Sequence, residues 1–61
     1  MRTVICISIR ETSPEQLKVN QQYKVDFEQA YGDSDGDWFV PVYTMTGDRL
    51  GVMNLKHFRS L

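Results

Sequence analysis

The sequence predicts an all-β fold, a small five-stranded barrel with a short 3-10 turn before the last strand. Three observations lead to this prediction. Apolar and polar side chains alternate over short runs, glycine-containing turns separate those runs, and the chain has only 61 residues. A barrel removes the edges that so small a flat sheet would expose. With no internal repeat and no linker, residues 1–61 are expected to form one domain.

The first strand is expected at about Thr3 to Ile9, because β-branched residues dominate this run and polar sequence bounds it. A short helical turn or a structured loop should follow at 12–16. Ser13 can cap such a turn, and Pro14 suits its first position. Asn20 is the non-glycine residue of the next turn that best accepts a positive φ.

The clearest strand is expected where Tyr23, Val25 and Phe27 alternate with charged residues. The stretch from Tyr31 to Asp37 holds glycines, aspartates and a serine, so it is interpreted as an exposed loop closing a hairpin.

The next strand is expected from Trp38 to Thr44, with Pro41 at an edge or a bulge because proline has no amide hydrogen to donate. The remaining expected elements are a tight turn at 45–48, a strand at 50–53, a single helical turn at 54–56 and a short last strand from His57 to Arg59.

Composition argues for a cytoplasmic protein. A single cysteine, Cys6, cannot form an internal disulfide, and it is interpreted as a small buried hydrophobe. The apolar run near Met1 is too short for a signal peptide or a membrane span, so no membrane association is expected.

Catalysis is not expected. The chain contains no glycine-rich phosphate loop, paired-carboxylate arrangement, nucleophile elbow or zinc-ligand spacing. A chain this short also leaves little room for a pocket that excludes water. We therefore expect neither an enzyme nor a bound cofactor.

Four segments together resemble the SH3 domain in residue type and spacing: Leu17 to Val25, Gly36 to Phe39, Thr46-Gly47, and Gly51 to Met53. In that family the glycine-aspartate-tryptophan opens the third strand and the threonine-glycine makes the distal turn. The later glycine opens the fourth strand ahead of a 3-10 turn. The resemblance implies the SH3-like barrel.

Three segments also look like those of short SH3-like proteins encoded by bacteriophages and prophages: Val4 to Ile7, Leu17 to Tyr23, and His57 to Leu61. This resemblance implies an accessory protein that binds a host protein in the host cytoplasm.

The leading hypothesis is a small protein-interaction module that binds a protein or peptide partner. The SH3 family binds proline-containing peptides in an aromatic groove, and the resemblance puts Trp38 at that groove. The first strand here lacks the tyrosines of that groove, and its proline position falls around Met53 to Asn54. The candidate contact residues are Tyr31, Asp33, Asp35, Asp37, Trp38, Asn54 and Phe58.

Two readings of Trp38 stay open. The indole either packs into the barrel or forms a half-exposed platform beside the acidic loop. The aspartates at 33, 35 and 37 also allow a calcium reading, but an EF-hand loop would need glycine at Trp38 and glutamate at Thr44. We expect a solvated acidic turn and no metal site.

The alternative function is a nucleic-acid-associated barrel that uses a basic patch near the carboxyl end. Its candidate residues are Lys56, His57 and Arg59, with Lys18 and Lys24 as further charges. Seven Lys and Arg against eight Asp and Glu give a net charge of −1, so there is no global positive field and nucleic acid is disfavoured. His57 is expected at the surface or partly buried. A monomer or a weak homo-oligomer is expected.

Overall fold

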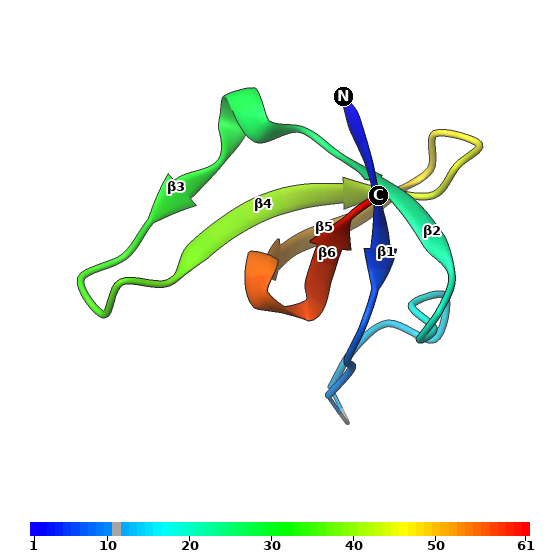
Figure 1. Cartoon of the computed structure of the whole chain (residues 1–61), viewed down its shortest axis with the longest axis horizontal. Helices are drawn as coiled ribbons and strands as arrows, with labels where there is room; N and C mark the ends of the chain where they lie inside the picture. Colours follow the sequence, from blue (N-terminus) through cyan, green and yellow to red (C-terminus); the bar gives the residue numbers. More distant parts are fainter. Residues whose placement is uncertain (11) are drawn as a thin grey trace.

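The computed structural model describes residues 1–10 and 12–61. Its elements are β1 (Arg2–Cys6), β2 (Gln22–Val25), the 3-10 turn η1 (Phe27–Gln29), β3 (Tyr31–Gly32), β4 (Trp38–Tyr43), β5 (Arg49–Asn54), the 3-10 turn η2 (Leu55–His57) and β6 (Phe58–Ser60) (Figure 1). All the strand pairs are antiparallel, so the all-β prediction is confirmed. No helix in the described part of the chain is long and apolar enough to cross a membrane.

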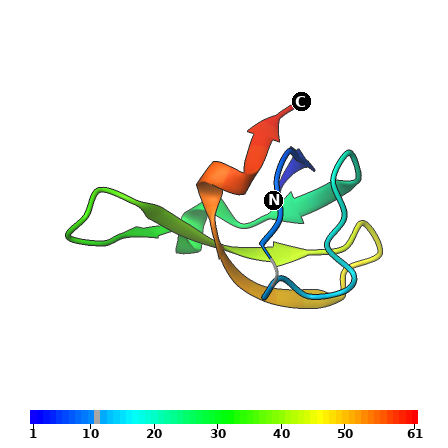
Figure 2. The same cartoon turned by 90° about the horizontal axis from the view of Figure 1, so that it is seen from below.

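Among the described residues the sheet has six strands and is open, which corrects the expected closed or half-closed barrel of five strands. β1 lies between β2 and β6, β2 joins β4, and β4 also pairs with β3 and β5. Within the described residues, β5 pairs only with β4 and β6 only with β1. Arg10 and residues 12–17, which follow β1, lie beside β5 in the place of a closing strand (Figure 2).

The sixth strand, β3, arises because η1 interrupts the alternating run that begins at Tyr23. Oδ1 of Asp26 accepts a hydrogen bond from the backbone N of Glu28 at 3.1 Å, which caps this 3-10 turn. Phe27 therefore leaves the expected strand and is exposed, whereas Tyr23 and Val25 are buried as the pattern indicates. Tyr31, expected in a loop, opens β3 instead.

The first strand ends at Cys6, earlier than expected. Beyond it, the backbone N of Ile7 donates to the carbonyl of His57 at 2.8 Å, which ties the end of β1 to η2. Asn20 has a φ of 71°, which confirms the predicted positive φ, and its backbone N donates to the carbonyl of Cys6 at 2.8 Å.

The segment around Ser13 is a structured loop and not a helix. The backbone N of Ser13 donates to the carbonyl of Arg10 at 3.0 Å, and Oγ of Ser13 accepts from the backbone N of Arg10 at 2.9 Å. The backbone N of Leu17 then donates to the carbonyl of Pro14 at 2.9 Å. These turns hold the loop in place without forming a helix.

The core is small and lies on one side of the sheet. Tyr23 and Phe58 meet edge to face with ring centroids 6.2 Å apart. The Tyr23 hydroxyl is satisfied inside the core, because it accepts from the backbone N of Lys18 at 2.8 Å and donates to the carbonyl of Gln16 at 2.6 Å. The buried apolar residues are Val4, Cys6, Leu17, Tyr23, Val25, Val40, Val42 and Phe58.

The hairpin of β4 and β5 turns where the sequence predicts. Gly47 has a φ of 99°, and its backbone N donates to the carbonyl of Thr44 at 2.9 Å. The ladder then shifts register, since Val42 lies opposite Gly51 while Tyr43 lies opposite Arg49. This bulge bends β5, and the expected helical turn follows it as η2.

Candidate functional site

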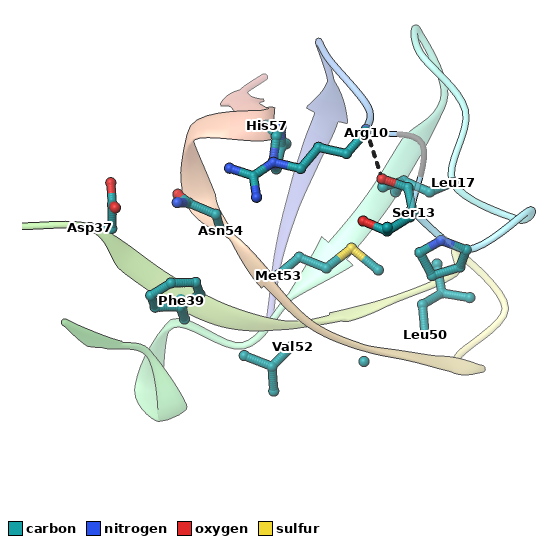
Figure 3. A pocket seen from close by; sticks show the side chains of 13 residues that line it. Arg10, Ser13, Leu17, Asp37, Phe39, Leu50, Val52, Met53, Asn54 and His57 are labelled. Atoms are coloured by element: carbon teal, nitrogen blue, oxygen red, sulfur yellow. Dashed lines mark hydrogen bonds between the residues drawn. The ribbon is translucent and has the colours of Figure 1, made fainter. Parts of the chain in front are cut away.

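Two hollows lie side by side on the surface. The larger, here called the β5 cleft, has a volume of about 400 Å³ and lies between Arg10 with residues 12–17 on one side and β5 on the other (Figure 3). The smaller, here called the Trp38 hollow, has a volume of about 270 Å³ and lies between Trp38 and η2. Asp37 and Asn54 line both, so the two hollows adjoin each other.

The β5 cleft has an apolar part and a polar part. Pro14 and Leu17 from the loop face Leu50 and Met53 from β5 across the apolar part. The polar part is lined by Arg10, Asp37, Asn54 and His57. The cleft can therefore take an apolar group and a charged group of the same ligand.

Trp38 is exposed, with 55% of its surface accessible. Of the two alternatives for this residue, the structure therefore agrees with an indole that lies outside the core. Trp38 lies opposite Gly32 in the ladder of β3 and β4. A Cβ added to Gly32 would come within 3.6 Å of Cε2 of the indole, so the ring rests against this glycine. The Trp38 hollow opens beside that ring and is also lined by Leu55 and Lys56.

Tyr31 is equally exposed, at 54%, but it faces the other way. It lies opposite Phe39 in the same ladder, and the two rings stack with centroids 5.6 Å apart. Because successive residues of a strand point to opposite faces, this pair lies on the face away from Trp38. The two candidate aromatic residues thus do not share one surface.

The acidic loop is held by its own first aspartate. Oδ1 of Asp33 accepts from the backbone N of Asp35 at 2.9 Å and from that of Asp37 at 3.0 Å. Asp35 is exposed, whereas Asp37 is half-buried where the two hollows meet. Among residues 1–10 and 12–61, no group of three or more His, Cys, Asp or Glu side chains is placed to hold a metal ion.

Phe58 belongs to the core, which corrects its place among the contact residues. Only 7% of its surface is accessible, and its ring packs against Tyr23. The pairing of β6 with β1 places Phe58 opposite Cys6, which is also a core residue. The side chain of Phe58 therefore points inward. Asn54, by contrast, is half-buried and lines both hollows.

The basic patch loses its central member. His57 is buried, and its Nδ1 lies 2.8 Å from Oγ of Ser8, so it does not form an exposed surface with its neighbours. Burial, with Arg10 and Lys56 nearby, lowers the pKa of His57 below its usual range. Lys56 and Arg59 are exposed. An imidazole that stays neutral and buried adds no positive charge for phosphate.

Cys6 is a buried thiol, as expected. Burial raises its pKa, while its Sγ donates to the carbonyl of Ser8 at 3.3 Å. A thiol with a raised pKa has little thiolate and so is a poor nucleophile.

Sequence reasoning missed the wall of the β5 cleft. Arg10, Pro14 and Leu17 lie far in sequence from the β5 residues that they face. No local pattern links the two segments, and only the turns around Ser13 bring the loop to β5.

Comparisons with protein-family models, with curated proteins and with solved structures found no match to this chain.

Proposed function

We propose that this chain is a small protein-interaction module that binds a peptide segment of a partner and performs no catalysis. The observation that carries the proposal is the exposed indole of Trp38 beside a hollow that adjoins the β5 cleft. Exposed tryptophans next to pockets are frequent anchors of protein interfaces, because they bury a large apolar surface with few rotatable bonds.

The shape and chemistry of the site support a peptide as ligand. The two hollows together follow the length of β5 and the start of η2, and both combine apolar with polar lining residues. An extended peptide can place an apolar side chain in one hollow and a polar side chain in the next. The further proposal that the partner is a host protein rests on the sequence resemblance to phage proteins alone.

We also propose that the fold is an open variant of the SH3-like architecture. β5 occupies one side of β4, so β2 and β3 lie on its other side. If β2 and β3 are counted as one strand that bends at η1, the sheet has the five strands that the sequence predicts. The single 3-10 turn η2 before β6 also supports this proposal.

The experiment compares Trp38→Ala with Met45→Ala, a control that removes an exposed apolar side chain lining neither hollow. Short linear random peptides are selected on wild-type protein by surface display, and the Kd of the enriched peptides is measured by fluorescence anisotropy. We expect Trp38→Ala to weaken binding by about tenfold or more, and Met45→Ala to leave it within about twofold. Equal effects of the two variants, or no enrichment at all, would contradict the proposal.

A further inference from the structure

The β5 cleft is bordered by the free edge of a strand. Five consecutive residues, Leu50 to Asn54, line it. Since side chains of a strand alternate between its faces, a wall made of consecutive residues is the strand's edge. Among the described residues, β4 is the only strand that pairs with β5, and no backbone hydrogen bond of a turn or loop involves Leu50 to Met53.

The ladder of β4 and β5 shows which backbone groups face the cleft. The carbonyl of Pro41 accepts from the backbone N of Asp26 at 3.2 Å, so Pro41 directs its backbone away from β5. Val52 lies opposite Pro41, and the two therefore form a non-hydrogen-bonded pair. The N–H and C=O of Val52 point outward into the cleft. By the same alternation, the backbone groups of Met53 point to β4 and the N–H of Asn54 points outward. The carbonyl of Asn54 is taken by η2, which Asn54 caps, so the outward groups are the N–H and C=O of Val52 and the N–H of Asn54.

Two outward-facing residues separated by one inward-facing residue are what a further strand needs for pairing. Exposed edges of this kind accept an extended chain from another protein, with main-chain hydrogen bonds giving affinity and side-chain pockets giving specificity. The apolar part of the cleft, between Leu17, Leu50 and Met53, would receive one side chain of such a strand.

The charged residues of the cleft indicate which charged group the added peptide strand carries. Figure 3 shows the Arg10 side chain extending from the loop across the cleft toward Asn54 and His57. Asp37 is the acidic side chain among the described lining residues, and it lies where the cleft joins the Trp38 hollow. A guanidinium binds a carboxylate through two parallel hydrogen bonds, so Arg10 fits an anionic group of the ligand.

We propose that the β5 cleft binds an extended peptide as an added strand on β5, with a carboxylate of the peptide at Arg10. This rests on the proposed function, in which the partner is a peptide, and names how that peptide is held. The carboxylate is either an acidic side chain or the C-terminus.

A second copy of the chain does not fit this edge. The loop residues Ser13, Pro14 and Leu17 form the opposite wall of the cleft. A folded sheet bringing its own β5 to this edge would have to displace that wall, which backbone hydrogen bonds at Arg10 to Ser13 and Pro14 to Leu17 hold in place. A single added strand lies only about 4.8 Å from the strand that it pairs with, so it needs far less room beside β5 than a folded sheet does.

The first test removes the outward N–H of Val52. Val52→Pro deletes this donor and leaves the amides that bond to β4, while Val52→Thr is the control that keeps the N–H and the branched side chain. The probes are the peptides enriched by display on wild-type protein. We expect Val52→Pro to weaken their binding by about tenfold or more, and Val52→Thr to change it by less than about threefold.

A second test uses only the wild-type protein, so it does not depend on whether a variant folds. Amide hydrogen exchange of the wild-type protein is measured by NMR with and without an enriched peptide. The Val52 amide should slow by about tenfold or more, whereas the Met53 amide, already bonded to β4, should change little. An unchanged Val52 amide in the saturated complex overturns strand addition.

The carboxylate is tested by Arg10→Gln and by changing the peptide. Loss of affinity on amidating the peptide's C-terminus assigns the carboxylate to the terminus, and loss on replacing its acidic side chain by the amide assigns it to the side chain. If binding is weakened neither by the two peptide changes nor by Arg10→Gln, the proposal that Arg10 binds a carboxylate is wrong.

The outcomes separate the two proposals. Peptides that need Trp38 but ignore Val52→Pro and leave the Val52 amide unprotected overturn strand addition and leave the proposed function standing. A selection that enriches no peptide overturns both.

Discussion

Pro41 lies opposite Val52 in the ladder of β4 and β5, and this pairing explains both residues. The nitrogen of Pro41, which has no hydrogen to donate, faces the interval between β2 and β3 where the ladder is already interrupted. A proline is thereby accommodated in the middle of a central strand. The same alternation turns the backbone of Val52 outward and leaves the edge of β5 available to a ligand.

The hydroxyl of Tyr23 should contribute measurably to stability. Tyr23→Phe removes a donor to Gln16 and leaves the backbone N of Lys18, which is partly buried in this hydrogen bond, without its acceptor. We expect the free energy of unfolding to fall by roughly 1–2 kcal/mol, measured by urea denaturation.

Tyr43→Phe is the control for this change. Tyr43 is half-buried, and the structure gives its hydroxyl no hydrogen bond to a described residue. Its removal should change the free energy of unfolding by less than about 0.5 kcal/mol. Equal losses in the two variants would show that the Tyr23 hydrogen bonds contribute nothing specific.

His57 should make stability depend on pH in the mildly acidic range. Its pKa is lowered by burial and then by Arg10 and Lys56, from an ordinary value of 6.5, so the folded state disfavours the charged form. Above pH 6.5 both states hold a neutral imidazole. As the pH falls below 6.5, the unfolded chain takes up the proton first, and the free energy of unfolding decreases.

The variant His57→Gln isolates this contribution. Unfolding is followed between about pH 7.5 and 5.5, a range above the titration of ordinary carboxylates. The wild type should lose stability over this range and the variant should be nearly flat. An identical slope in both proteins would exclude His57 as the cause.

Cys6 should react only when the protein opens. Its side chain is buried and its pKa is raised by that burial, so little thiolate meets a reagent in the folded state. We expect iodoacetamide to alkylate the native thiol at least about a hundredfold more slowly than the same thiol in guanidinium at equal pH. Similar rates in the two conditions would mean that Cys6 is accessible.

Asp33 should matter to the acidic loop more than Asp35. Oδ1 of Asp33 accepts from two backbone N–H groups, while the exposed side chain of Asp35 has no hydrogen bond among those the structure shows for the loop. Asp33→Ala should lower the free energy of unfolding by about 1 kcal/mol, and Asp35→Ala should change it by less than about 0.5 kcal/mol. Thermal denaturation monitored by circular dichroism compares the two. The reverse order would contradict the loop geometry.

The sequence predicted those parts of the fold that depend on local patterning. Alternation at Tyr23 and Val25 indicated the buried face of β2, and the special conformations of Asn20 and Gly47 follow from what those residues tolerate. Alternation continues through Phe27, however, and it could not show that Asp26 would cap a 3-10 turn and split the strand.

The candidate site was less predictable, because it depends on contacts between distant segments. Spacing could not show that Phe58 faces the core or that Tyr31 and Trp38 face opposite ways, since strand register decides both. Burial of His57 depends on its contact with Ser8, which is 49 residues earlier. The openness of the sheet depends on where the loop after β1 lies, and no local pattern encodes that position.

The outward orientation of the β5 backbone is tested most directly by amide exchange in the free protein. The Val52 amide should exchange at least about tenfold faster than the Met53 amide, because only the latter is bonded to β4. Similar protection of both amides would mean that the edge of β5 is already occupied, and a peptide could not be added there as a strand.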